Sequence, residues 1–219
     1  MLDPVPPRFN LARYCLAENA RLRPDATALT IVGDGVAQRW SHGELDLKVR
    51  RLAAGLRGLG LPRGARVMIR MGNEANAALA YFASIAAGYV ALLASSQLTF
   101  EEAEFMARDC GASVLALGAS FEEEAHSGDV RILRSADLAR LGDSAVLPDY
   151  VDTAADDPAY LVYTSGTTSR PKGVLHAHRA AWGRRPMREH WTGLGPGDVM
   201  LHAGAINWTY TLGVGVVDP

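Results

Sequence analysis

The sequence predicts an α/β protein in which helices cover both faces of a largely parallel sheet, a layered α/β/α arrangement. Helical and strand signals alternate along most of the 219 residues, and two capping boxes mark the starts of helices. Such alternation favours parallel strands joined by helical crossovers. With 48% hydrophobic and 21% charged residues the composition is that of a globular protein. A chain of this length buries about 70% of its unfolded surface.

The first elements are separated by turn residues. Residues 9–21 have a helical pattern that must end before Pro24, because the residue before a proline disfavours helix. The apolar run 28–32 predicts a strand, and a Gly-Asp-Gly turn leads from it into a second strand at 37–40.

A capping box opens the next helix. The hydroxyl of Ser41 can accept from the amide of Glu44, whose carboxylate can accept from the Ser41 amide. The helix carries one apolar stripe, formed by Leu45, Val49, Leu52, Leu56 and Leu59. Three arginines lie off the stripe and are interpreted as a solvated face: Arg50, Arg51 and Arg57.

An alanine-rich stretch follows the short strand predicted at 66–70. Residues 75–94 contain few strongly polar side chains, so their length alone would permit a membrane span. Alanine is only weakly apolar, and Gly88 interrupts the run. We therefore expect a buried helix followed by a buried strand at 89–93, and no membrane span.

A second capping box, Thr99 with Glu102, predicts a helix that extends to about Cys110. The apolar run 113–117 predicts the next strand. Residues 118–157 have weaker patterns, and we expect short elements and surface loops there.

The last third contains four further predicted elements. Residues 159–163 and 173–178 are interpreted as strands, and 179–191 as a helix that Pro186 interrupts or ends. A short strand is predicted at 198–201. We find no internal repeat and no low-complexity segment.

Bulk charge and cysteine usage exclude several classes of protein. The net charge of −2 favours neither nucleic acid nor an anionic membrane as a partner. Cys15 and Cys110 lie far apart without metal-ligand spacing, which is typical of small core residues in a reducing compartment. Residues 1–7 lack the layout of a signal peptide. These features predict a cytoplasmic protein.

The loop over residues 164–173 has a composition suited to a polyanion. Hydroxyl side chains can donate O–H hydrogen bonds to phosphate oxygens, and the two glycines let backbone N–H groups approach those oxygens closely. Lys172 adds a positive charge. Such a charge about 4 Å from a phosphate oxygen gains roughly 4 kcal/mol at an effective dielectric near 20. The order of residues does not fit the Walker pattern. Composition alone is also compatible with a solvated surface loop.

The order Tyr163-Thr-Ser-Gly-Thr-Thr-Ser-Arg-Pro-Lys-Gly173 resembles the signature of the AMP-forming acyl-CoA synthetases, the adenylate-forming ligases. Their pattern is Tyr/Phe-Thr-Ser-Gly-Thr-Thr-Gly-x-Pro-Lys-Gly, so Ser169 replaces a glycine. If positive φ is needed there, serine costs about 1 kcal/mol. The resemblance implies that six residues bind the phosphates of ATP: Thr164, Ser165, Gly166, Thr167, Thr168 and Lys172.

A second motif, residues 202–210, is rich in glycine, alanine and aromatic residues. Its aromatic side chains could be ordinary core residues. The resemblance implies instead that Trp208, Tyr210 and His202 line an acyl pocket or form its gate. For His202 two roles stay open, polarising a carboxylate or capping a strand end.

Metal binding by protein histidines is not predicted. His176 and His178 are two residues apart on a strand and would point to opposite faces. Magnesium carried by ATP binds mainly through phosphates with one or two carboxylates, and the loop contains no carboxylate.

The resemblance implies a two-step reaction. A carboxylate attacks the α-phosphate of ATP to give an acyl-adenylate and pyrophosphate, and coenzyme A then displaces AMP. The substrates would be a small carboxylic acid, ATP with Mg²⁺, and coenzyme A. An aromatic or medium-chain apolar acid would suit Trp208 and Tyr210.

The family's adenine-binding segment, ribose-binding aspartate, hinge and C-terminal lid are not found in residues 1–219. We therefore expect the N-terminal part of a large domain, inactive on its own and without a catalytic residue. The alternative is a non-catalytic nucleotide-binding or interaction module. We also expect an exposed apolar surface through which two copies could form a homodimer.

Overall fold

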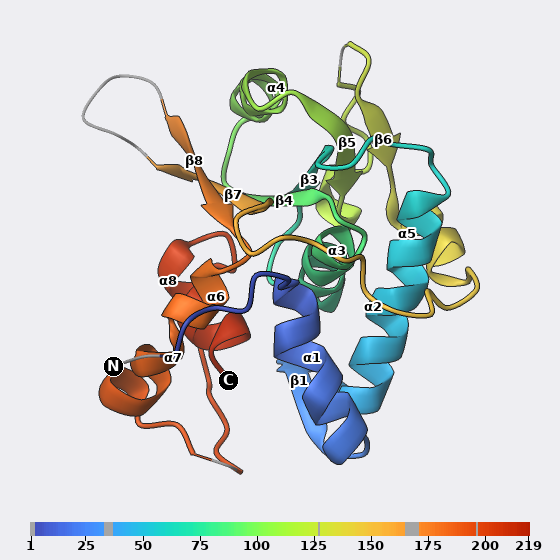
Figure 1. The fold of residues 1–219 in the computed structure, drawn as a ribbon. Coiled ribbons are helices and arrows are strands. Elements are labelled where there is room, and N and C mark those ends of the chain that lie inside the picture. The colour runs from blue at the N-terminus through green and yellow to red at the C-terminus, as the bar shows by residue number, and fades with distance from the viewer. Residues whose placement is uncertain (1–2, 33–36, 127, 165–170, 196) are drawn as a thin grey trace.

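The computed structural model describes residues 3–32, 37–126, 128–164, 171–195 and 197–219. These residues form a six-stranded sheet with helices on both faces and a separate two-stranded sheet (Figure 1). The order in the large sheet is β6-β5-β3-β4-β7-β8. Its strands are β3 (Arg66–Arg70), β4 (Val90–Ala94), β5 (Ala112–Leu117), β6 (Arg131–Leu133), β7 (Pro158–Thr164) and β8 (Lys172–Ala177). All neighbours are parallel except β7 and β8, so the prediction of a largely parallel α/β/α fold is confirmed.

The N-terminal helix α1 (Leu11–Leu22) begins two residues later than predicted because Asn10 caps it. The Asn10 Oδ1 atom accepts from the amide of Arg13, and its Nδ2 atom donates to the carbonyl groups of Ile85 and Val151. After α1 the chain forms the antiparallel pair β1 (Thr27–Ile31) and β2 (Gln38–Ser41).

One face of the large sheet is covered by α1, α2 (His42–Arg57), α3 (Ala75–Ala86) and α5 (Ser135–Gly142). The predicted capping box of Ser41 and Glu44 opens α2. Its apolar stripe is buried at Leu45, Val49, Leu52 and Leu56. Gly55 permits close packing, because a Cβ atom there would lie 2.5 Å from the carbonyl oxygen of Leu141 in α5.

The other face packs against α4 (Phe100–Asp109), which begins at the predicted capping box of Thr99 and Glu102. Alternate strand residues point to this side, as expected for a pleated sheet. The contacts join strand residues Met68, Val90, Leu92, Leu115 and Leu117 to Ala103 and Met106 of the helix.

The alanine-rich stretch folds as predicted. Helix α3 is almost wholly buried, and Gly88 turns the chain into β4 with a φ of +80°. Among the described residues, no helix is both long enough and apolar enough to cross a membrane. The weakly patterned region 118–157 contains the short helix η1 (Ala119–Phe121), β6 and α5.

The C-terminal part differs from the prediction in two places. The predicted helix 179–191 is broken into α6 (Ala180–Gly183), α7 (Arg185–Met187) and the π-helical η2 (Arg188–Thr192). Pro186 is placed in the first turn of α7, where it is tolerated because no intrahelical N–H bond is lost. The chain then continues to α8 (Thr209–Leu212) and the π-helical η3 (Gly213–Val217).

The strand predicted at 198–201 does not form. The segment is irregular, and the side chains of Val199 and Leu201 are 91% and 82% exposed. A strand needs a neighbour for its backbone groups, and none of the described strands pairs with this segment.

Candidate functional site

The predicted phosphate loop joins the antiparallel strands β7 and β8. Thr164 and Lys172 are register partners at its two ends, and both are exposed. Ser165, Gly166, Thr167, Thr168 and Ser169 lie outside the described residues. The structure therefore brings together the two described members of the predicted set and shows where the loop begins and ends.

The loop ends lie at the carboxyl edge of the parallel strands. Strand β4 pairs with β7 only at Tyr160 and Leu161, so residues 162–164 extend beyond that pairing toward the loop. In open parallel sheets, ligands bind outside the carboxyl ends of the strands. Thr164 and Lys172, the described residues at the loop ends, thus lie at the edge where such a sheet binds a ligand.

A packed aromatic ring supports the base of the loop. Tyr163 pairs with Gly173 across the hairpin, and a Cβ atom at residue 173 would lie 3.3 Å from the Tyr163 ring. The Tyr163 hydroxyl donates to the carboxylate of Asp109 at the end of α4. Burial, followed by this hydrogen bond, raises the pKa of Tyr163, so the phenol stays a neutral donor.

The second motif presents two aromatic side chains to the surface. Trp208 is the N-cap residue of α8 and is 62% exposed, and Tyr210 is 55% exposed. The interpretation of these two residues as core aromatics is therefore wrong. Their exposure leaves both side chains free to contact a ligand or another polypeptide surface.

His202 is held inside the second motif. Its ring lies 5.3 Å from that of Tyr210, edge to face, and its Nδ1 atom accepts from the amide of Gly204. A role as a strand cap is excluded because no strand forms before it. The Nδ1 contact fixes the ring orientation and leaves Nε2 as the nitrogen for any further partner.

Sequence reasoning missed Asn73, which lies in the turn between β3 and α3. Its side chain contacts the backbone of the second motif at Gly204 and Ile206. No periodic or local signal marks such a contact, because 131 residues separate Asn73 from Gly204.

The two histidines after the loop make unrelated contacts. His176 stacks on Tyr160 with ring centroids 4.5 Å apart, whereas the fully buried His178 accepts from the amide of Leu11 through Nδ1. Burial lowers the pKa of His178 to about 4, so the ring is neutral near pH 7. Within the described residues, no group of three or more His, Cys, Asp or Glu side chains could hold a metal ion.

A buried cation also lies at the carboxyl edge, at the end of β3. The Arg70 guanidinium forms an ion pair with Glu124 at 2.9 Å and donates to the carbonyl oxygens of Ser95 and Leu98. Its side chain is 2% exposed and packs over the ring of Phe121. This arginine is committed to protein partners and is not a phosphate ligand.

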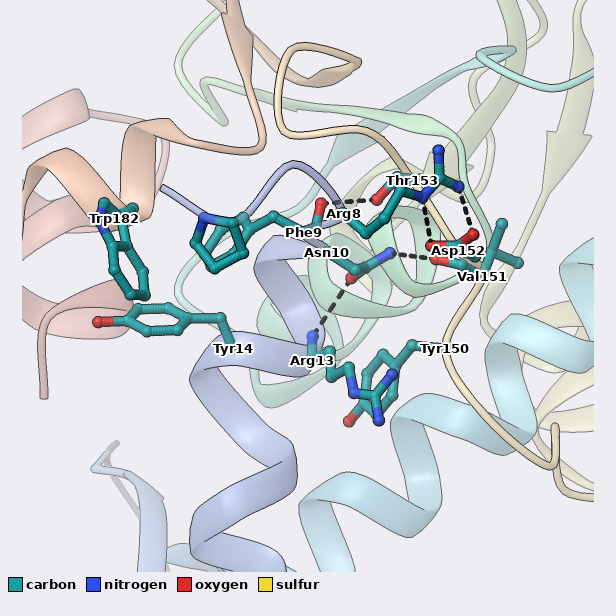
Figure 2. Close-up of a pocket in the computed structure, with 11 residues that line it drawn as sticks. Arg8, Phe9, Asn10, Arg13, Tyr14, Tyr150, Val151, Asp152, Thr153 and Trp182 are labelled. Atoms are coloured by element: carbon teal, nitrogen blue, oxygen red, sulfur yellow. Dashed lines mark hydrogen bonds and ion pairs between the residues drawn. The ribbon is translucent and has the colours of Figure 1, made fainter. Parts of the chain in front are cut away.

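A half-open cavity of about 350 Å³ lies at the other end of the hairpin (Figure 2). Trp182 and Thr153 line it. Thr153 comes five residues before β7 begins at Pro158, and Trp182 comes five residues after β8 ends at Ala177, so the cavity lies toward the end of the hairpin opposite the loop. Arg8 pairs with Asp152 beside it, and the Asn10 side chain is fully hydrogen-bonded. Arg8, Asp152 and the Asn10 side chain thus already have partners within the protein, and we take the carboxyl edge as the candidate site.

Residues 16–217 match the family described as AMP-binding enzyme. A 3-hydroxybenzoate–CoA/4-hydroxybenzoate–CoA ligase of Thauera aromatica is 26% identical over 189 residues, which cover 79% of this chain and 36% of that protein. The p-hydroxybenzoic acid–AMP ligase FadD22 of Mycobacterium marinum is 32% identical over 185 residues, which cover 82% of this chain and 25% of that protein.

The fold is also that of solved structures. A benzoate CoA ligase from Burkholderia xenovorans LB400 superimposes with a TM-score of 0.83 at 24% identity, over 96% of this chain and 43% of that chain. The chain thus spans 36% and 25% of the length of these two curated relatives and 43% of this solved structure. The match over residues 16–217, together with the loop at the carboxyl edge, shows that this chain belongs to the AMP-binding enzyme family.

Proposed function

We propose that this chain is the phosphate-binding part of an AMP-forming acid–CoA ligase. In that reaction the oxygen of a carboxylate attacks the α-phosphorus of ATP, the bond to the β-phosphate oxygen breaks, and pyrophosphate leaves. The thiolate of coenzyme A then attacks the acyl carbon of the adenylate and displaces AMP. The observation that carries the proposal is the location of Thr164 and Lys172 at the carboxyl edge, in a chain of this family.

The role assigned to the loop is electrostatic. Lys172 and the hydroxyl groups of Thr164, Ser165, Thr167 and Thr168, with the backbone at Gly166, would hold the β- and γ-phosphates. They would stabilise the charge that develops on the leaving pyrophosphate. Mg²⁺ would be bound mainly through the phosphates of ATP, as is usual for this ion.

For the acid, we propose an aromatic carboxylate. Trp208 and Tyr210 offer exposed aromatic faces at the start of α8, which suit stacking on a ring. Similar proteins include 3-hydroxybenzoate–CoA ligases and a 4-coumarate–CoA ligase. A long-chain fatty acid–CoA ligase of Mycobacterium tuberculosis is also similar, at 27% identity, so a fatty acid belongs in the same test.

Homodimer formation stays a prediction. The described surface carries large exposed apolar side chains in two regions. One set lies on or next to α1, β1 and α2: Tyr14, Leu22, Val32 and Leu47. The larger set lies on β8 and on the segment that follows α7: Val174, Leu175, Trp191, Val199, Leu201, Trp208 and Tyr210.

The main test is acid-dependent ATP–pyrophosphate exchange by the complete polypeptide that contains these 219 residues. Benzoate, 3-hydroxybenzoate, 4-coumarate and palmitate form the panel, and we expect the aromatic acids to support exchange. Lys172→Ala should lower the exchange rate about 10²–10³-fold, as expected when one charge-stabilising donor is lost. Lys48→Ala is the matched control, because Lys48 is an exposed lysine on α2.

The chain offers an internal control for binding as well, since Lys48 and Lys172 are its only lysines. Limited acetylation followed by mass spectrometry should show that ATP protects Lys172 and leaves Lys48 reactive. Protection without exchange would identify a non-catalytic nucleotide-binding module. No protection of Lys172 at saturating ATP would contradict a phosphate-binding role.

A further inference from the structure

Asn73 links two parts of the candidate site that are far apart in the sequence. It follows the carboxyl end of β3 and precedes α3, in a turn that a hydrogen bond from the Glu74 amide to the Gly72 carbonyl holds at 2.8 Å. The turn therefore lies at the same edge of the sheet as the phosphate loop. Its position is fixed by β3, which pairs with β4 on one side and β5 on the other.

The Asn73 side chain uses both of its polar atoms on the second motif. Its Nδ2 atom donates to the carbonyl oxygen of Gly204 at 2.9 Å, and its Oδ1 atom accepts from the amide of Ile206 at 2.9 Å. The side-chain amide thus bonds the chain as a neighbouring strand would, with one donor and one acceptor. Ile206 is anchored on its other side by burial of its side chain, which is 8% exposed.

Little freedom remains between this anchor and Trp208. The Trp208 amide donates to the carbonyl oxygen of Ala205, and its own carbonyl accepts from Leu212 in the first turn of α8. Gly204 is packed as well, because a Cβ atom there would lie 2.3 Å from Thr211 Oγ1. A shift at Gly204 and Ile206 would therefore be passed to the start of α8, where Trp208 lies.

We propose that Asn73 is a positioning residue that fixes the second motif against the carboxyl edge of the sheet and so sets the affinity for the acid but not for ATP. The proposal rests on the proposed function, in which Trp208 contacts the acid. The selectivity follows from the architecture: the second motif depends on Asn73, whereas Thr164 and Lys172 are held by the pairing of β7 with β8.

The first measurement is hydrogen exchange at the Ile206 amide in the complete polypeptide, which needs no catalytic activity. Asn73→Ala should speed this exchange about fivefold, the factor that one net hydrogen bond of typical strength supplies. Asn73→Asp keeps an oxygen that can accept from the amide, so its Ile206 exchange should stay close to wild type. Asn76→Ala is the matched control, because Asn76 is an exposed asparagine in the first turn of α3.

The second measurement is the pair of KM values in the exchange assay with benzoate. Asn73→Ala should raise the KM for benzoate roughly tenfold, within the range that misplaced positioning groups produce, and leave the KM for ATP unchanged. A merely structural role would raise both constants together or lower the amount of folded protein without changing either.

The outcomes separate the two proposals. Unchanged Ile206 exchange in Asn73→Ala, or an equal rise in both KM values, would overturn the role of Asn73. If the wild-type polypeptide shows no ATP–pyrophosphate exchange with any acid, the proposed ligase function fails. The rate of hydrogen exchange at the Ile206 amide then still decides whether Asn73 fixes the second motif. Equal hydrogen-exchange rates at the Ile206 amide in Asn73→Asp and Asn73→Ala would contradict the hydrogen bond assigned to Asn73 Oδ1.

Discussion

Strands β4 and β8 belong to the same sheet, yet their surroundings are opposite. All five residues of β4 are buried, because α3 packs on one face and α4 on the other. The first four residues of β8 are exposed, including Val174 and Leu175. Strand β4 thus belongs to a scaffold in which the burial of side chains on both faces stabilises the fold. Strand β8 is an edge strand that begins at the candidate site. Mutations should therefore affect stability at β4 and function near β8.

The largest expected effect on stability lies in the scaffold. Leu92→Ala removes a fully buried side chain from β4 and should lower the free energy of unfolding by about 2–5 kcal/mol. Leu201→Ala, the same change at an 82% exposed position, should stay within about 0.5 kcal/mol. Urea denaturation of both variants measures the difference. Equal losses would show that the segment after α7 packs as tightly as β4.

The buried side chain of His178, which follows β8, should make the free energy of unfolding depend on pH. Burial lowers its pKa to about 4, partly opposed by Asp157, whereas the unfolded chain keeps a value near 6.5. The unfolded state therefore takes up the proton first. The contribution of neutral His178 is fully present above about pH 6.5 and is lost toward pH 4, by an amount on the order of 3 kcal/mol.

His178→Asn tests this assignment. Asparagine keeps an oxygen that can accept from the Leu11 amide but does not titrate, so the variant should lose much less stability between pH 6.5 and 4.5. Denaturant midpoints across this range give the answer. His176 and His42 also have lowered pKa values because they are partly buried, so a smaller dependence should remain. An unchanged pH profile in His178→Asn would assign the effect to other groups.

A smaller effect is expected where two scaffold helices touch. Glycine to alanine usually stabilises a helix interior by up to about 1 kcal/mol. At Gly55 the sign should reverse, with a loss of about 1–3 kcal/mol, because the new Cβ atom would meet the backbone of Leu141. Gly142→Ala in α5 is the control, since a Cβ atom there meets nothing within 4 Å. Thermal unfolding would show the two shifts. A stabilised Gly55→Ala would mean that α5 can move away from α2.

The same division explains what the sequence could predict. Capping boxes at Ser41 and Thr99 and the stripe along α2 are local signals, and each marked its element correctly. The segment 198–201 has strand-like residues but no partner, and strand formation depends on a neighbour that local pattern does not supply. The role of Asn73 could not be predicted for the same reason, because its hydrogen-bond partners Gly204 and Ile206 come from a distant part of the chain.

Gly173 changes what the signature of the loop means. The sequence suggested that its glycines let backbone approach a ligand, but at residue 173 the neighbour is the ring of Tyr163. That ring is tied through Asp109 to the end of α4. At least one residue of the motif, Gly173, thus packs against a side chain of the protein itself rather than serving a nucleotide. A related chain could therefore retain Thr164 and Lys172 and still lose the packing of Gly173 on Tyr163 that supports both ends of the loop.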